Sequence, residues 1–311
     1  MNKKREPTPA MLFIFQKDNM SSKQKILILF FCLLFFEQPW ASQETLINSQ
    51  PMQVDSIAVL EKEIQKPGNN FALKIRLGNL YLQNEQLDEA EELFNKLIAD
   101  DSLAVEAITG SGLVNFSRQP SKIIPFERIK EMLKIDFRSR AIKKFKQALA
   151  IDSTYLPARY YLAQSYLRKS DVENLAQAEK EFKYLLGVNP NYRDLTYQLG
   201  VTFQKKKEYH QALTYFNRIS EKENDYARAR IRMSETNYEI QNYEQCTLCY
   251  YQAMQTLTDK ETLDYLFEEQ KMLLTDQEKK EFEAAPYDKK RNIFFRFWKS
   301  RDPDPLSLIH I

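Results

Sequence analysis

The chain has 311 residues, enough for one or two domains with a substantial buried core. Its net charge at pH 7 is only +2, because Lys and Arg are mixed with Asp and Glu along the sequence. This mixture predicts solvated helix faces and argues against nucleic acid as a partner, since nucleic-acid-binding proteins usually carry a concentrated basic excess. The content of 6 Gly beside 17 Tyr and 20 Phe favours long, closely packed helices.

The N-terminal region has the features of an export signal. Two lysines precede an apolar run over residues 26–36, and the small residues Ala41 and Ser42 follow it. This order is typical of a secretory signal peptide, and the run is short for a transmembrane helix. We therefore assign residues 1–42 to an N-terminal extension and signal peptide, with an uncleaved membrane anchor as the alternative. The mature protein is expected in the periplasm or cell envelope.

Residues 54–258 contain a recurring pattern of two amphipathic helices joined by a short turn. The same interval separates Gly78 from Ala90 and Gly200 from Ala212, and a phenylalanine follows each alanine four positions later. Small residues at these positions let two helices approach closely, and the large aromatic rings fill the space between one hairpin and the next. Neither helix can bury its apolar stripe alone, so we expect the hairpins to stack into a solenoid.

Three further copies of this pattern are less regular. One has a longer turn, between Ala163 and Ala178. A second is interrupted by an insert at residues 117–139, which contains two prolines and a basic helical pattern. In the last copy Ser234 and Cys246 occupy the two small-residue positions. A lone helical segment before the first copy predicts an N-terminal cap.

The repeated pattern resembles the tetratricopeptide repeat (TPR) family, whose unit is a helix–turn–helix of about 34 residues. The resemblance implies an all-α fold, a right-handed α-solenoid of TPR-like helical hairpins with a short helical C-terminal extension. The first helices of successive hairpins would then line a concave face that holds a protein or peptide partner. Projecting the helical period onto these helices gives the expected partner-binding residues, which are Asn79, Gln83, Tyr160, Gln164, Arg168, Tyr197, Lys205, Glu235 and Tyr238. An equally weighted alternative is that several of them are ordinary surface residues or pack against neighbouring repeats.

Signals for catalysis are weak. The sequence has 2 His and none of the common hydrolase, nucleotide-binding or zinc-protease motifs, so we expect neither enzymatic activity nor a cofactor. Cys246 and Cys249 form a C-x-x-C pattern. Helix packing is the preferred interpretation, a local disulfide is the main alternative, and redox catalysis is the least favoured. We predict no metal site, because further zinc ligands are missing nearby.

Two further helices are predicted after the repeats, in residues 259–305. Thr275 and Glu278 have the spacing of a capping box, which predicts a helix start. An apolar stripe over residues 289–299 predicts the next helix, and the prolines that follow force the chain out of it.

The region 259–305 resembles the opening of the GWxTD domain, which occurs in exported bacterial proteins. The resemblance rests on a motif formed by Phe297, Trp298, Arg301, Asp302 and Pro303. It implies a partial domain, because the name-giving motif of the family is absent. Residues 306–311 match the translation of a common sequencing adapter, so we interpret the chain as truncated.

These features predict an exported, non-enzymatic TPR scaffold for protein–protein interaction in the bacterial cell envelope. The alternative is an enzyme or enzyme-accessory protein whose active part lies in the missing C-terminal GWxTD domain. A membrane is expected to be involved only through the transient signal peptide or, in the alternative, an uncleaved anchor.

Overall fold

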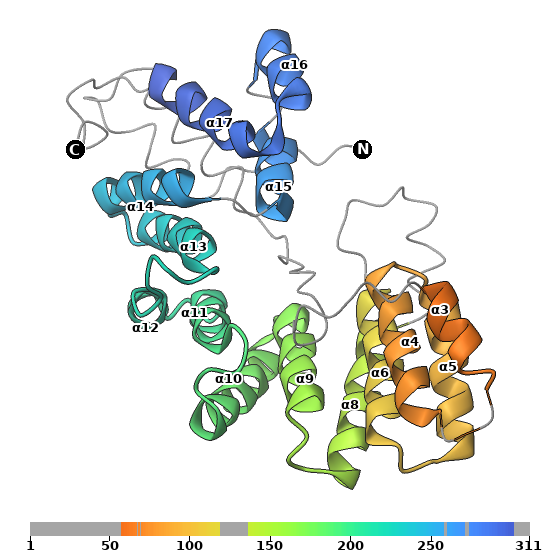
Figure 1. The fold of residues 1–311 in the computed structure, drawn as a ribbon. Helices are drawn as coiled ribbons and strands as arrows, with labels where there is room; N and C mark the ends of the chain where they lie inside the picture. The colour runs from red at the N-terminus through yellow and green to blue at the C-terminus, as the bar shows by residue number, and fades with distance from the viewer. Residues whose placement is uncertain are drawn as a thin grey trace, which may run out of the picture. The chain divides into compact units, whose positions relative to one another are not determined.

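The computed structural model describes residues 57–66, 68, 70–118, 136–257, 260–270 and 274–301. Every regular element in these ranges is an α-helix, which confirms the predicted all-α class (Figure 1). The helices fall into two compact units, one reaching to Glu208 and the other beginning at Tyr209. This boundary lies inside the range in which the sequence predicted one continuous repeat region.

Several predictions fall on residues outside the described ranges. They concern the signal peptide, most of the insert between residues 117 and 139, and the chain after Arg301. Across the described ranges, no helix combines the length and apolar character that crossing a membrane requires.

The first unit is a row of stacked helical hairpins. Its helices are α3 (Ile57–Glu63), α4 (Phe71–Gln83), α5 (Leu87–Asp100), α6 (Val105–Ser117), α8 (Phe137–Ile151), α9 (Leu156–Lys169), α10 (Val172–Val188) and α11 (Leu195–Lys205). α4 packs with α5, α6 with α8, and α9 with α10, and each hairpin packs on the next (Figure 1). α3 packs on α4, where the sequence predicted an N-terminal cap. We call α4, α6, α9 and α11 the inner helices, as the first helix of each pair.

Phe94 of α5 explains why small residues recur in the inner helices. Its ring is fully buried, and a Cβ atom added to Gly78 of α4 would lie only 2.6 Å from it. A Cβ atom added to Gly110 of α6 would lie closer still to the same ring. The ring therefore sits between two inner helices that both have glycine at the contact. Phe145 of α8 lies in the same way against Gly112 of α6, where an added Cβ atom would be 2.6 Å from the Phe145 ring.

The turns inside the hairpins repeat one backbone geometry. Glu85, Lys207 and Gln241 each follow a first helix of the repeat pattern and adopt left-handed backbone angles, with φ of 60°, 62° and 62°. The next amide in each turn donates back to a carbonyl of the last helical turn, as in a Schellman motif. These bonds are Gln86 N to Tyr81 O at 2.8 Å, Glu208 N to Phe203 O at 2.9 Å and Asn242 N to Asn237 O at 2.8 Å. The common geometry shows that the repeats are equivalent even where their sequences differ.

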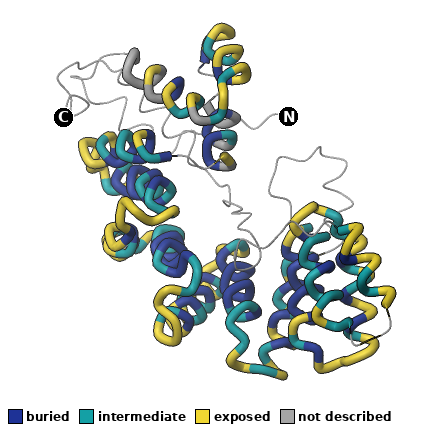
Figure 2. Tube along the Cα trace, in the orientation of Figure 1, coloured by how far each residue is buried: buried dark blue, intermediate teal, exposed yellow. Residues whose placement is uncertain are grey.

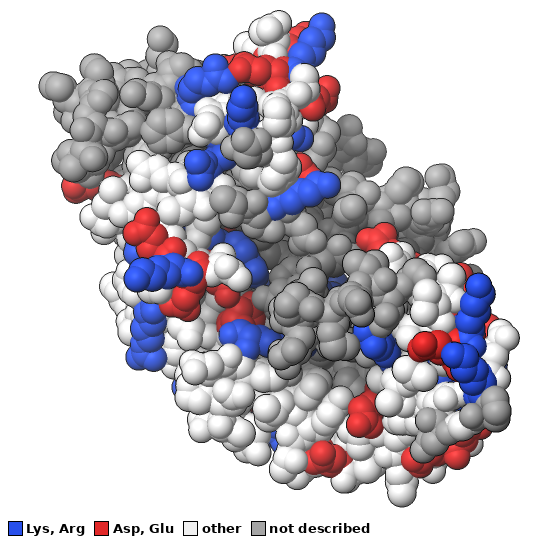
Figure 3. Space-filling model, in the orientation of Figure 1, with Lys and Arg blue, Asp and Glu red and all other residues white. Residues whose placement is uncertain are grey.

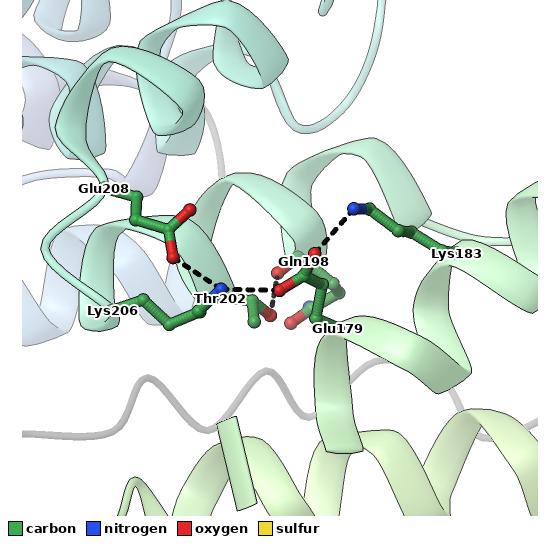
Figure 4. A network of polar contacts seen from close by, with 6 residues as sticks. All are labelled: Glu179, Lys183, Gln198, Thr202, Lys206 and Glu208. Atoms are coloured by element: carbon green, nitrogen blue, oxygen red, sulfur yellow. Dashed lines mark hydrogen bonds and ion pairs between the residues drawn. The ribbon is translucent and has the colours of Figure 1, made fainter. Parts of the chain in front are cut away.

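An ionic network ties α10 to the end of α11 (Figure 4). The Glu179 carboxylate accepts hydrogen bonds from Lys183 Nζ at 2.5 Å and from Lys206 Nζ at 2.6 Å. Lys206 also pairs with Glu208 at 2.5 Å. Burial alone would raise the pKa of Glu179, but the hydrogen bonds from the two lysines outweigh burial and lower it below its usual value. The charged form of Glu179 is therefore stabilised by folding.

We predict that Glu179→Gln lowers the free energy of unfolding by about 1 kcal/mol at pH 7. Because the folded-state pKa is depressed, this contribution is present at neutral pH and is lost as the pH falls through that pKa. Urea unfolding midpoints measured from neutral to acidic pH should therefore show the wild type and the variant converging. Glu221→Gln, an exposed change outside the helices, is the control and should shift no midpoint. A constant difference between wild type and Glu179→Gln at every pH would contradict the prediction.

The second unit contains a further hairpin of the repeat pattern, made of α13 (Tyr226–Glu239) and α14 (Tyr243–Thr256). The other helices of this unit are α12 (Tyr209–Phe216), α15 (Lys260–Gln270), α16 (Asp276–Ala284) and α17 (Tyr287–Arg301). α13 packs closely with α14, and α12 packs on α13. Ser234 Oγ lies 3.3 Å from Cys246 Sγ, so the two small-residue positions of this copy meet across the hairpin as predicted.

The C-terminal helices follow their local signals. Glu278 N donates to Thr275 Oγ1 at 3.2 Å and Thr275 N donates to Glu278 Oε2 at 2.8 Å, which confirms the capping box at the start of α16. The predicted second helix is α17, and Phe294 on it is fully buried. Its ring meets Phe282 edge-on at 5.0 Å, and Phe282 stacks on Phe267 at 4.2 Å. These contacts show that an aromatic core joins α15, α16 and α17, although the sequence analysis did not predict α15.

The GWxTD-like motif lies at the end of α17. Phe297, Trp298 and Arg301 belong to this helix, but their side chains are outside the described part of the structure. Asp302 and Pro303 are outside it altogether. The GWxTD resemblance therefore stays a prediction.

Candidate partner-binding site

The expected partner-binding residues lie on the helices that the sequence predicted to carry them. Asn79 and Gln83 are on α4, Tyr160, Gln164 and Arg168 on α9, Tyr197 and Lys205 on α11, and Glu235 and Tyr238 on α13. Their exposure divides them into three groups (Figure 2). Gln83 is exposed; Asn79, Arg168, Lys205 and Tyr238 are half-buried; Tyr160, Gln164, Tyr197 and Glu235 are buried. The structure therefore leaves only part of the set accessible to a partner.

Tyr160 is the centre of a buried polar network between α9 and α11. The side chain is 1% exposed, and its hydroxyl donates to Asp194 Oδ1 at 2.6 Å. Gln164 Nε2 donates to the Tyr160 hydroxyl at 3.1 Å, and Gln198 Nε2 donates to Asp194 Oδ2 at 2.6 Å. These bonds join two inner helices from neighbouring hairpins. For Tyr160 and Gln164 the structure favours the packing alternative over partner contact.

Arg193 stands beside this network and was not singled out from the sequence. Its guanidinium carbon lies 4.9 Å from the ring centre of Tyr160, 5.1 Å from that of Tyr161 and 5.6 Å from that of Tyr192. Its Nη1 also donates to the Tyr161 hydroxyl at 3.0 Å. The cation is therefore surrounded by tyrosines, which stabilises both the charge and the stacking of the hairpins. The sequence signal was the Arg-Asp pair directly before α11.

Arg168 and Lys205 reach the C-terminal ends of the inner helices that precede them. Arg168 Nη1 donates to the carbonyl of Phe116 in the last turn of α6 at 3.2 Å. The guanidinium carbon of Arg168 also lies 3.5 Å from the centre of the Phe116 ring. Lys205 Nζ donates to Ser170 Oγ at 2.7 Å and approaches the Leu167 carbonyl of α9 at 3.4 Å. Cations are favoured at these positions because helix C-termini carry partial negative charge. Both side chains thus connect neighbouring inner helices.

The charge of Arg168 persists at neutral pH. Burial, together with the nearby charge of Arg138, lowers the pKa of Arg168 to about 10. The guanidinium remains protonated well above physiological pH, although it is less stable in that form than an exposed arginine. An anionic group of a partner would stabilise it further.

The second unit contributes less accessible surface at the predicted positions. Glu235 is 9% exposed and accepts a hydrogen bond from Arg232 Nη1 at 2.9 Å. Tyr238 meets Tyr243 edge-on at a centroid distance of 5.8 Å. Glu235 and Tyr238 therefore make internal contacts within their own unit.

Cys246 and Cys249 are both free thiols and both buried, so the disulfide alternative is not formed in this structure. Burial raises the pKa of Cys246 to about 11 and also raises the pKa of Cys249. Little thiolate is present at neutral pH, and the thiolate is the reactive form. The contacts favour the packing interpretation. Within the described ranges, His, Cys, Asp and Glu side chains form no cluster that could hold a metal ion.

The accessible inner-helix residues carry amide and cationic groups, namely Asn79, Gln83, Arg168 and Lys205. Such donors suit the backbone carbonyls and carboxylates of an extended peptide. On the face shown in Figure 3, acidic and basic side chains lie intermixed.

The sequence matches the family model of the tetratricopeptide repeat over residues 75–120. No curated protein shows a significant match. The fold is similar to TTC0263, a thermophilic TPR protein in Thermus thermophilus, with 20% identity and a TM-score of 0.48, covering 66% of this chain and 100% of that one. YrrB, described as a TPR protein with an unusual peptide-binding site, has 20% identity and a TM-score of 0.46, covering 66% and 96%. MamA from Desulfovibrio magneticus RS-1 has 11% identity and a TM-score of 0.48, covering 61% and 96%.

Proposed function

We propose that this protein is a non-enzymatic scaffold that binds a protein or peptide partner through the inner helices of its first unit. The observation that carries the proposal is the stack of helical hairpins, in which residues 75–120 match the tetratricopeptide repeat. Stacked hairpins present a continuous surface across several repeats, and such surfaces are suited to extended partners. The accessible donors on α4, α9 and α11 would supply the polar contacts, and the buried tyrosine network would keep the helices in place.

We also propose that the protein acts in the bacterial cell envelope. The support comes from the sequence alone, in the apolar run over residues 26–36 with its flanking lysines and small residues. Likewise, the motif that begins at Phe297 supports the proposal that α16 and α17 open a GWxTD-type domain. Detection of the protein in the cytoplasm, with the N-terminal segment intact, would contradict the location.

Site-specific photocrosslinking in the native cell tests the binding surface. A photoreactive amino acid at Gln83, which is exposed on an inner helix, should crosslink a discrete partner that mass spectrometry identifies. The same amino acid at Lys180, which is exposed on α10, is the control and should not capture that partner. With the purified partner, Asn79→Ala and Gln83→Ala should each weaken binding about fivefold, the loss of one typical hydrogen bond. Equal crosslinking at the two positions, or none at Gln83, would contradict the proposal.

A further inference from the structure

The outward face of α8 carries only positive charge. The helix buries Ala141, Phe145 and Ala148 against its neighbours and contains no Asp or Glu. Its cations are spread over the remaining surface, with three exposed and two half-buried at the edges; they are Arg138, Arg140, Lys143, Lys144 and Lys146. Among the helices described in the first unit, no other combines this many cations with a lack of acidic residues.

These five cations have no acidic partner in the part of the chain that the structure describes. The other cations of the unit show the contrast, since Arg118 pairs with Asp88 and Lys206 pairs with Glu179. The aspartates at the two ends of α8 already accept hydrogen bonds from backbone amides. Asp136 accepts from Ser139 N at 3.0 Å, and Asp152 accepts from Thr154 N at 2.8 Å. Their carboxylates therefore contribute to the helix ends and leave the face between them uncompensated.

The uncompensated charge costs stability. Arg140 lies one helical turn from Lys143 and Lys144, and like charges at these spacings repel along a helix. Arg138 adds to the repulsion because its charge also acts on the half-buried Arg168. A negatively charged group from outside the unit would relieve this repulsion. The cost is thus consistent with a surface that is completed by a partner.

The basic surface does not continue onto α5. When Phe94 of α5 is placed in register with Phe145 of α8, Glu89 and Glu92 fall at the positions of Arg140 and Lys143. The equivalent helices therefore carry opposite charge at matching positions. Along its axis the basic surface extends over about 12 Å, the length of eight helical residues. A long or flat polyanion that covered α8 would also meet acidic side chains of α5.

We propose that α8 is a second docking surface and binds a short acidic segment of a protein partner. A helix with carboxylates one turn apart would place them opposite the cations of α8, each pair adding a charge-assisted hydrogen bond. Ile151, at the C-terminal end of the same helix, is 39% exposed and offers an apolar contact at one end of the surface. This surface shares no residue with the inner-helix binding surface.

The test is fluorescence anisotropy of a labelled helical peptide of about fifteen residues, with glutamates one turn apart and a leucine near one end. The full chain should bind this peptide, and the affinity should fall as salt is raised. The variant Arg140→Glu/Lys143→Glu should lose at least about tenfold in affinity, because attraction becomes repulsion at the centre of the surface. The control Lys222→Glu/Lys280→Glu makes the same change in net charge at exposed sites of the second unit and should bind as the wild type does.

Three outcomes would overturn the proposal. They are the absence of peptide binding at low salt, equal loss of affinity in the two double variants, and tighter binding of a DNA duplex or an anionic lipid vesicle than of the peptide. Misfolding is separated from lost binding by circular dichroism. The new carboxylates repel each other but lie one helical turn from Lys144 and Lys146, so the helix content should not change. The Asn79→Ala/Gln83→Ala variant should bind the acidic peptide normally, so this test is independent of the inner-helix binding surface.

Discussion

Replacing Phe94 by alanine is expected to lower the free energy of unfolding by about 3–5 kcal/mol, the usual cost of removing a fully buried phenylalanine. The ring is fully buried and fills the space between α4 and α6, next to Gly78 and Gly110. Its removal leaves a cavity at the junction of two hairpins. Because each repeat is stabilised mainly by its neighbours, the loss should affect the whole first unit. Urea unfolding followed by circular dichroism gives the change in free energy.

The same ring makes a sharper test possible with Gly110→Ala. A Cβ atom at Gly110 would overlap the Phe94 ring, so this substitution should destabilise by about 1–3 kcal/mol although alanine favours the helix. In a Phe94→Ala background the added methyl group has space, and the substitution should become neutral or stabilising. The double-mutant cycle should therefore show a coupling above about 1 kcal/mol.

Gly187 provides the control for this cycle. It lies in α10 with no atom within 4 Å of an added Cβ, so Gly187→Ala should stabilise by about 0.5–1 kcal/mol through helix propensity alone. If Gly110→Ala behaved like Gly187→Ala, or if its effect were additive with Phe94→Ala, the close approach at Phe94 would not be what requires glycine at this position.

The hairpins could be predicted from the sequence because their signals are local and repeated. Gly78 marks a close helix contact that the structure confirms, since a Cβ atom added there would lie 2.6 Å from the Phe94 ring of the same hairpin. The capping box at Thr275 is local as well, since its two hydrogen bonds join residues three positions apart. Such local patterns can be recognised in the sequence without knowing how the neighbouring hairpin packs.

The candidate binding residues could be predicted only in part. The helical period gave the side of α9 on which Tyr160 lies, but it gave no measure of how far the next hairpin covers that side. Tyr160 is buried because the loop before α11 brings Arg193 and Asp194 onto it. The unpaired charge of α8 was equally hidden, because a sequence contains cations without showing which of them find a carboxylate in the fold. Both features depend on tertiary contacts between separate repeats.

Asp194 is expected to be the most sensitive polar residue of the first unit. It is 6% exposed and accepts hydrogen bonds from the Tyr160 hydroxyl and from Gln198 Nε2, both at 2.6 Å. Asp194→Ala leaves both buried donors without this acceptor and removes a negative charge beside Arg193. We expect a loss of about 3 kcal/mol in the free energy of unfolding, measured by urea titration. Tyr160→Phe removes the bond to Asp194 and the acceptor of Gln164 Nε2 but keeps the Asp194 charge, and it should cost about 1–2 kcal/mol.

Comparing Asp194→Ala with Tyr160→Phe also shows whether Asp194 only stabilises the fold or also sets the position of α11 relative to α9. Lys205 of α11 contacts Ser170 at the end of α9, and Asp194 at the start of α11 contacts Tyr160 of α9, so we expect Asp194 to influence the distance between the two helices. If Asp194 sets the distance between α9 and α11, Asp194→Ala should increase amide hydrogen exchange at the end of α9, whereas Tyr160→Phe should leave it nearly unchanged. Partner binding at Gln83, which lies on α4, should weaken little in Asp194→Ala. Equal exchange in the two variants would mean that Asp194 only satisfies buried donors, and that Arg193 and the tyrosines around it suffice to hold α9 and α11 together.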